Sequence, residues 1–159
     1  MPVARKPSPR LADSEINLAD LREAALRLLA RREHSYVELV RKLTRRGWPE
    51  PEVGSVVDEL ADENLQSDER FAESYARSRA AKHYGPVRIR AELSERGIDR
   101  ALADRAIREL EADWFALAAE WYERRYGTRP AEDLKERSRR QQALARRGFA
   151  HEHVRELLS

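Results

Sequence analysis

One pattern that occurs three times, at intervals of 50 and 51 residues, constrains the fold of this 159-residue chain more than any other feature. It reads LTRRGW at 43–48, LSERGI at 93–98 and LARRGF at 144–149. Each copy thus joins a leucine, a glycine and a large apolar residue at one spacing. Internal repeats of this period are typical of small supersecondary units arranged in tandem. The pattern therefore predicts three equivalent modules.

The residues around each glycine predict a helix, a turn and a second helix. Apolar positions on both sides are spaced three and four residues apart, as on one face of a helix. We expect Gly47, Gly97 and Gly148 to adopt the left-handed conformation that commonly ends a helix. The apolar residue after each glycine then turns back into the core.

Several helix starts follow from the sequence as well. Ser35 and Glu38 have the spacing of a capping box, and Asp99 is a suitable N-cap. The segment 87–90 alternates apolar and basic residues, which by itself is typical of a strand. Its place in the repeat instead predicts a helix from Pro86 to Arg96, with the proline in the first turn.

The predicted fold is all-α, with three tandem three-helix, helix-turn-helix-like repeats in an elongated array. The expected parts are a disordered basic tail over 1–17 and repeats over 18–66, 67–112 and 113–159. The expected helices span 18–32, 35–46 and 50–62 in the first repeat, 68–82, 86–96 and 99–111 in the second, and 113–126, 130–146 and 150–158 in the third.

Composition agrees with small helical modules and narrows the function. Charged residues make up 38% of the chain and aromatic residues 7%, a composition typical of small helical layers with a large solvent-exposed surface. The absence of cysteine excludes disulfides, thiol nucleophiles and cysteine-ligated metals. No apolar run is long enough for a membrane span and the N-terminus lacks the apolar part of a secretory signal, so we expect a cytoplasmic protein.

Recognisable catalytic patterns are missing. The sequence contains no phosphate-binding glycine loop, no nucleophile elbow and no H-E-x-x-H motif. The acids are spread along helix faces, where they serve as salt-bridge partners rather than acid–base pairs. We therefore expect no enzyme, metal or cofactor, and a hydrolase or nuclease built from scattered acids is disfavoured.

Basic residues recur on the middle helix of each repeat and mark the candidate binding surface. One interpretation is a line of charge that contacts phosphates or an acidic protein groove; the other is ordinary solvated helix faces in a chain with 27 arginines and 4 lysines. If Ile89 is buried, its two arginine neighbours lie about 100° to either side of it and line separate margins. The predicted contact residues are Arg41, Lys42, Arg45, Arg77, Arg79, Lys82, Arg88, Arg90, Arg137 and Arg140.

A helix-turn-helix regulator that binds DNA directly is the alternative. Such a protein places its last helix in the major groove. Here the segment 50–62, the last helix of the first repeat, carries five acids and no basic residue, and phosphates would repel it. The second repeat has a mixed last helix.

The segment 68–98, DERFAESYARSRAAKHYGPVRIRAELSERGI, resembles the signature of the RecX family, regulators of the bacterial RecA recombinase. Segment 25–43 resembles the first repeat of that family, and the similarity extends over about 20–159. His83 departs from the family pattern, because a glycine often precedes the Tyr-Gly-Pro there. The matching residues, expected to be mostly structural, include Asp68, Phe71, Tyr84, Gly85, Pro86, Leu93 and Gly97.

The resemblance implies a function that composition alone does not. RecX-like proteins bind the RecA filament on single-stranded DNA, lie in its groove and inhibit strand exchange, ATP hydrolysis and coprotease activity without being enzymes. For this chain it implies RecA as the partner, with direct DNA contact left open, and a monomer is expected. The family supplies no residue-level site, so the basic residues above rest on charge and motif position.

Overall fold

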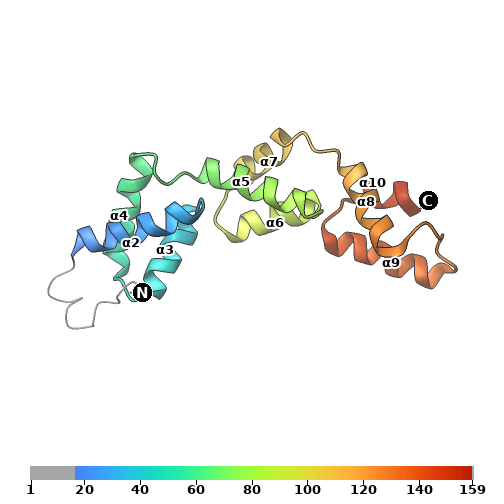
Figure 1. Ribbon diagram of the computed structural model, residues 1–159, viewed down its shortest axis with the longest axis horizontal. Helices are drawn as coiled ribbons and strands as arrows, with labels where there is room; N and C mark the ends of the chain where they lie inside the picture. The colour runs from blue at the N-terminus through green and yellow to red at the C-terminus, as the bar shows by residue number, and fades with distance from the viewer. Residues whose placement is uncertain (1–16, 159) are drawn as a thin grey trace. The chain divides into compact units, whose positions relative to one another are not determined.

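The computed structural model describes residues 17–158, and this part of the chain is helical with no strand (Figure 1). The predicted all-α fold of three tandem three-helix repeats is confirmed. The predicted tail over 1–17 lies outside the described residues except for Asn17, whose side chain caps the first described helix. The helices are α2 (Leu18–Arg31), α3 (Tyr36–Arg45) and α4 (Glu50–Asp62), then α5 (Asp68–Ala81), α6 (Pro86–Glu95) and α7 (Arg100–Glu109), then α8 (Trp114–Tyr126), α9 (Leu134–Arg147) and α10 (His151–Leu158).

The three repeat glycines end their helices in the predicted way. Gly47, Gly97 and Gly148 have φ values of +103°, +80° and +105°. The amide of the residue after each glycine donates to the carbonyl of the repeat leucine, as from Ile98 to Leu93 at 3.0 Å. This is a Schellman turn, and it brings the apolar residue after the glycine onto the leucine five positions before it.

Replacing Gly97 with valine is expected to lower the free energy of unfolding by about 2 kcal/mol, because a β-branched residue is strained at positive φ. Urea unfolding followed by circular dichroism measures the change. Ser94→Val is the matched control, since Ser94 is exposed on α6 with ordinary helical geometry. An equal loss in both variants would contradict the role of the left-handed backbone.

Helix starts follow the local signals, with one difference. The capping box of Ser35 and Glu38 is present, Asp99 caps α7, and Pro86 begins α6, so the strand-like segment 87–90 is helical. The third repeat differs from the prediction, because α9 begins at Leu134 rather than near 130. Asp133 accepts the Glu136 amide at 2.8 Å and thereby determines the start of the helix.

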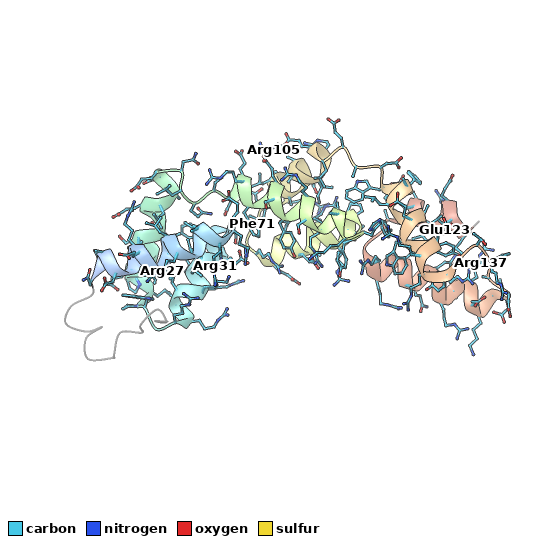
Figure 2. All side chains as sticks on the ribbon, in the orientation of Figure 1. Arg27, Arg31, Phe71, Arg105, Glu123 and Arg137 are labelled. Atoms are coloured by element: carbon cyan, nitrogen blue, oxygen red, sulfur yellow. The ribbon has the colours of Figure 1, made fainter. Side chains whose placement is uncertain are left out.

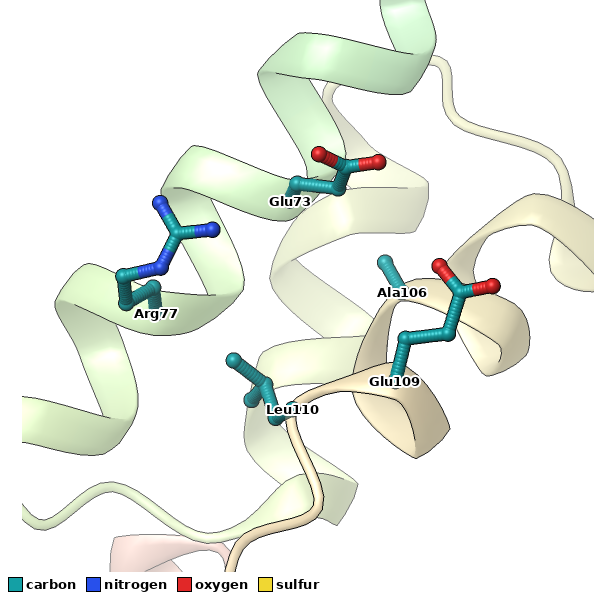
Figure 3. Close-up of a pocket in the computed structure, with 5 residues that line it drawn as sticks. All are labelled: Glu73, Arg77, Ala106, Glu109 and Leu110. Atoms are coloured by element: carbon teal, nitrogen blue, oxygen red, sulfur yellow. The ribbon is translucent and has the colours of Figure 1, made fainter.

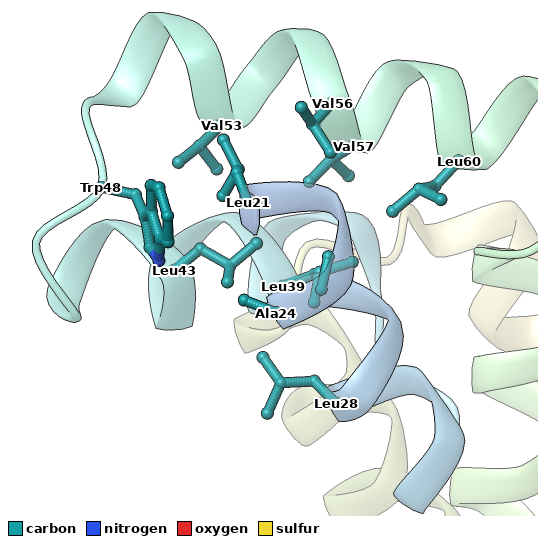
Figure 4. Packing of buried hydrophobic residues seen from close by; sticks show 11 residues of the cluster. Leu21, Ala24, Leu28, Leu39, Leu43, Trp48, Val53, Val56, Val57 and Leu60 are labelled. Carbon is teal, nitrogen blue, oxygen red and sulfur yellow. The ribbon is translucent and has the colours of Figure 1, made fainter. Parts of the chain in front are cut away.

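The first repeat has a continuous core that draws on all three of its helices (Figure 4). Leu21 of α2, Leu39 and Leu43 of α3, and Val53 of α4 have no exposed surface. Trp48 follows the turn glycine and is 8% exposed, so its indole closes the end of this core. The leucine and the residue after the glycine are thus the anchors of the repeat.

The second and third repeats bury the equivalent residues. Leu93 and Ile98 are buried in the second, and Leu144 and Phe149 in the third. Besides Phe71, the buried side chains of α5 in the second repeat are small, which allows close helix packing. These are Ala72, Ala76 and Ala80.

The described chain forms two compact units, and the boundary falls within α5. One unit ends at Phe71 and the other begins at Ala72. The first turn of α5 is bound to the first repeat: the Tyr36 amide donates to Asp68 at 2.8 Å, and Arg70 pairs with Glu33 at 2.9 Å. The Asp68 carboxylate therefore links the start of α5 to the start of α3.

Candidate functional site

The Tyr84 ring lies at the junction of the second and third repeats, under three guanidinium groups. The guanidinium carbons of Arg79 and Arg147 are each 3.7 Å from the ring centroid, and that of Arg88 is 4.6 Å away. Arg147, followed by Arg79 and Arg88, holds the pKa of the Tyr84 phenol below its ordinary value. Cation–π contacts from both repeats thus meet on one side chain.

The glycine after Tyr84 allows the two backbones to touch. The Gly85 amide donates to the Arg147 carbonyl at 3.0 Å, and the Val87 amide donates to the Gly148 carbonyl at 2.9 Å. A Cβ at position 85 would lie 2.3 Å from the Gly148 carbonyl carbon, closer than any side chain allows. The Tyr-Gly-Pro motif is therefore the surface on which the third repeat docks.

Arg147 closes this junction from the third repeat. Its Nε donates to the His83 carbonyl at 2.9 Å, and a terminal nitrogen donates to the Lys82 carbonyl. His83 has φ of +63°, a conformation that favours glycine. This explains physically why a glycine suits the position before the Tyr-Gly-Pro motif.

Glu92 binds two of the three arginines that contact the Tyr84 ring. Its carboxylate accepts from the Tyr75 hydroxyl at 2.8 Å, from Arg79 at 2.9 and 3.0 Å, and from Arg88 at 3.0 Å. Burial acts to raise the pKa of the Glu92 carboxyl, but the bonds from Arg88, Tyr75 and Arg79 outweigh it, and the pKa lies below its ordinary value. Arg79 and Arg88 are thus held by an internal carboxylate.

Five of the ten predicted contact residues have such internal partners. Besides Arg79 and Arg88, Arg90 pairs with Asp104 at 2.6 Å. Arg140 is 5% exposed and donates to the Tyr122 hydroxyl and the Arg129 carbonyl. Lys42 lies 2.9 Å from His34 Nε2, and its pKa is lowered chiefly by burial. These side chains help to hold the fold together.

The histidine beside Lys42 is also part of the fold. His34 is 1% exposed, and its other ring nitrogen lies 3.0 Å from the Arg32 carbonyl. Burial lowers the pKa of His34, and the charges of Arg32 and Lys42 act in the same direction. A neutral ring that accepts from Lys42 and donates to Arg32 satisfies both contacts.

The remaining predicted residues point to solvent. Arg45 on α3 and Arg77 on α5 are exposed, as is Lys82 just after α5. Arg137 on α9 is partly exposed (Figure 2). None of these four has a carboxylate partner within the described residues. Arg41 is exposed on α3 too. Five predicted residues thus bind internal partners, whereas Arg45, Arg77, Lys82 and Arg137 have no carboxylate partner in the described chain.

A shallow notch of about 230 Å³ lies beside Arg77, between α5 and α7 (Figure 3). Glu73 and Arg77 come from α5, and Ala106, Glu109 and Leu110 from α7 and its end. Within residues 17–158, the notch included, no group of three or more histidine, aspartate or glutamate side chains is placed to hold a metal ion. Charge recognition is the chemistry that this surface offers.

Sequence reasoning missed Arg147 and Glu92 as centres of the junction. Glu92 lies four residues after Arg88, so an ion pair between Arg88 and Glu92 along one helix could have been predicted. Arg147 directly precedes the third repeat glycine. No local signal reveals that Arg147 meets Tyr84, 63 positions earlier in the chain.

No helix in the described range combines the length and apolar character needed to cross a bilayer.

Comparisons with known proteins agree with the three-repeat architecture. The family models for the first, second and third three-helix domains of RecX match residues 22–60, 67–107 and 111–158.

Relatives named Regulatory protein RecX match most of the chain. The protein from Pseudomonas entomophila is 44% identical over 139 residues, which cover 87% of this chain and 90% of the relative. The protein from Halorhodospira halophila is 46% identical over 135 residues, covering 85% and 84%. A crystal structure of RecX from Lactobacillus salivarius superposes with a TM-score of 0.70 at 26% identity, covering 87% of this chain and 92% of that one. With all three domains matched in order, the chain belongs to the RecX family of regulatory proteins.

Proposed function

We propose that this chain is a non-enzymatic inhibitor of the RecA recombinase that acts in the cytoplasm by binding the RecA filament on single-stranded DNA. Family membership supports a regulatory role. The observation that carries the proposal is that four predicted contact residues are exposed or partly exposed and have no internal ion-pair partner among the described residues. These four, called the free basic set, are Arg45, Arg77, Lys82 and Arg137.

The free basic set suits a binding surface of opposite charge. Exposed guanidinium and ammonium groups bind phosphate or carboxylate oxygens, and they speed association through long-range attraction. The Tyr84 junction already joins the second and third repeats before binding. The entropy lost when Arg77, Lys82 and Arg137 bind a partner together is therefore smaller. Bound to the filament, the protein blocks the addition of further RecA subunits by steric occlusion and favours filament disassembly.

Direct action as a helix-turn-helix DNA reader is less well supported. The last helix of the first repeat, α4, carries Glu50, Glu52, Asp58, Glu59 and Asp62 and no basic residue. Asp58 accepts the Tyr36 hydroxyl at 2.6 Å, a bond that raises the pKa of Tyr36 to about 12. A phosphate groove would repel this helix, so α4 does not suit the role of a recognition helix.

Charge reversal of Arg77 and Lys82 to glutamate is expected to weaken inhibition of RecA ATPase on single-stranded DNA about tenfold, since two exposed contacts become repulsive. The measurement is the concentration of this protein that halves RecA ATP hydrolysis. Arg31→Glu with Arg124→Glu is the control, because it changes the net charge equally at exposed positions outside the free basic set. Reversal of Arg88 and Arg90 is a poorer test, since it also breaks two ion pairs.

Three results would count against parts of the proposal. Full inhibition by the Arg77 and Lys82 variant would remove these residues from the contact surface. Absence of any wild-type effect on RecA would overturn the function. Tight binding to one DNA sequence without an effect on RecA would favour the helix-turn-helix alternative.

A further inference from the structure

The second and third repeats carry a groove at the same place, between their second and third helices. The groove between α6 and α7 has a volume of about 370 Å³, and that between α9 and α10 about 390 Å³. Six lining residues of the second groove lie 51 positions after six lining residues of the first, so the grooves are equivalent within the repeat. The six pairs are Arg90 and Gln141, Ala91 and Gln142, Ser94 and Ala145, Ile98 and Phe149, Arg100 and His151, and Ala103 and Val154.

The α9–α10 groove has an apolar floor and a positively charged rim. Phe149, Val154 and Leu158 line it and are each less than 10% exposed. Arg137 and Arg155 stand at its rim, no carboxylate is among its lining residues, and neither arginine has an ion-pair partner in the described chain. A ligand that brings carboxylates would therefore meet two unneutralised guanidinium groups.

The equivalent groove in the second repeat differs in charge. Arg90 lies 2.6 Å from Asp104, and Arg100 lies 3.7 Å from the same carboxylate. In the first repeat the position of Arg100 is taken by Glu50. The second and third repeats thus have grooves of similar size and position, but only the groove of the third repeat has arginines without a carboxylate partner in the described chain.

We propose that the α9–α10 groove binds an acidic segment of a partner protein, with an apolar side chain on the groove floor and flanking carboxylates on Arg137 and Arg155. The inference rests on the proposed function in taking the partner to be a protein. Nucleic acid fits less well, because phosphates gain nothing from an apolar floor. Base stacking needs an open aromatic face, and Phe149 is only 3% exposed.

The size of the groove agrees with this occupant. A volume of about 390 Å³ is within the ordinary range of ligand sites and admits a leucine or phenylalanine side chain. Apolar burial supplies affinity, and the rim charges select the sequence that flanks the anchor. Binding should accordingly weaken as salt rises, because the rim arginines are exposed to solvent.

The test is a nuclear magnetic resonance titration of the isotope-labelled full chain with the acetylated, amidated peptide DDLFEE. We expect amide shifts in α9 and α10 and none in α6 and α7, and no response to the charge-reversed peptide KKLFKK. Ala145→Phe fills the groove from an exposed helix position and should weaken binding at least about tenfold. Ser94→Phe fills the equivalent groove of the second repeat and should leave binding unchanged.

The proposal is overturned if DDLFEE causes no shifts, if KKLFKK causes the same shifts, or if Ala145→Phe binds as tightly as wild type. Should Ala145→Phe fail to fold, Arg137→Glu with Arg155→Glu replaces it, with the same expected loss. RecA ATPase is measured in parallel. If the peptide binds but RecA ATPase is not inhibited, only the proposed function is contradicted. If RecA ATPase is inhibited but the peptide does not bind, only the proposed role of the groove is contradicted.

Discussion

Replacing Gly85 with alanine is expected to lower the free energy of unfolding of the full chain by about 3 kcal/mol, measured by urea denaturation. The added Cβ would lie 2.3 Å from the Gly148 carbonyl carbon and oxygen and 2.4 Å from the Phe149 nitrogen. These are backbone atoms, which cannot rotate away as a side-chain end would. Gly85 itself has φ of −85°, so alanine suffers no backbone strain and the clash alone is tested.

Gly54→Ala is the matched control. Gly54 lies within α4 and a Cβ there meets nothing within 4 Å, so alanine should raise stability by about 0.5–1 kcal/mol. Hydrogen exchange locates the damage in the Gly85 variant, because the Val87 amide that donates to Gly148 loses protection if the junction opens. Equal effects of the two substitutions, or an unchanged Val87 amide, would argue against docking through Gly85.

Features set by neighbouring residues were predictable from the sequence. The leucine, glycine and apolar residue of each repeat specify a Schellman turn within six positions, so Gly47, Gly97 and Gly148 could all be assigned. The capping box at Ser35 and the proline start at Pro86 are equally local. The start of α9 was expected near 130, whereas Asp133 provides the N-cap and the helix begins at Leu134.

The candidate site depends on contacts between distant residues, and there prediction was weaker. Arg77 and Arg79 are two positions apart and so point to different sides of α5. One is exposed, and the other binds Glu92 on the next helix. Arg140 looked like a surface charge, yet it is buried against Tyr122. Charge and motif position identified the basic helices, while ion-pair partners decided which charges remain free.

Glu92→Ala is expected to cost about 3 kcal/mol of folding stability, because three charged or polar donors lose one acceptor at once. Arg79 and Arg88 both touch the Tyr84 ring together with Arg147, so without Glu92 three guanidinium groups share one site without a carboxylate. The loss is measured by urea unfolding at neutral pH. Glu109→Ala is the control, since Glu109 is exposed on α7 and has no ion-pair partner in the described residues.

The dependence of folding stability on pH distinguishes the contribution of the Glu92 charge from that of its packing. A carboxyl whose pKa is lower in the folded protein stabilises the fold above the unfolded value of 4.5 and loses that contribution as pH falls below it. Wild type should therefore lose stability below about pH 4.5, and Glu92→Ala should lose less over the same range. Parallel pH profiles for the two proteins would show that Glu92 does not hold the arginines of the junction through its charge.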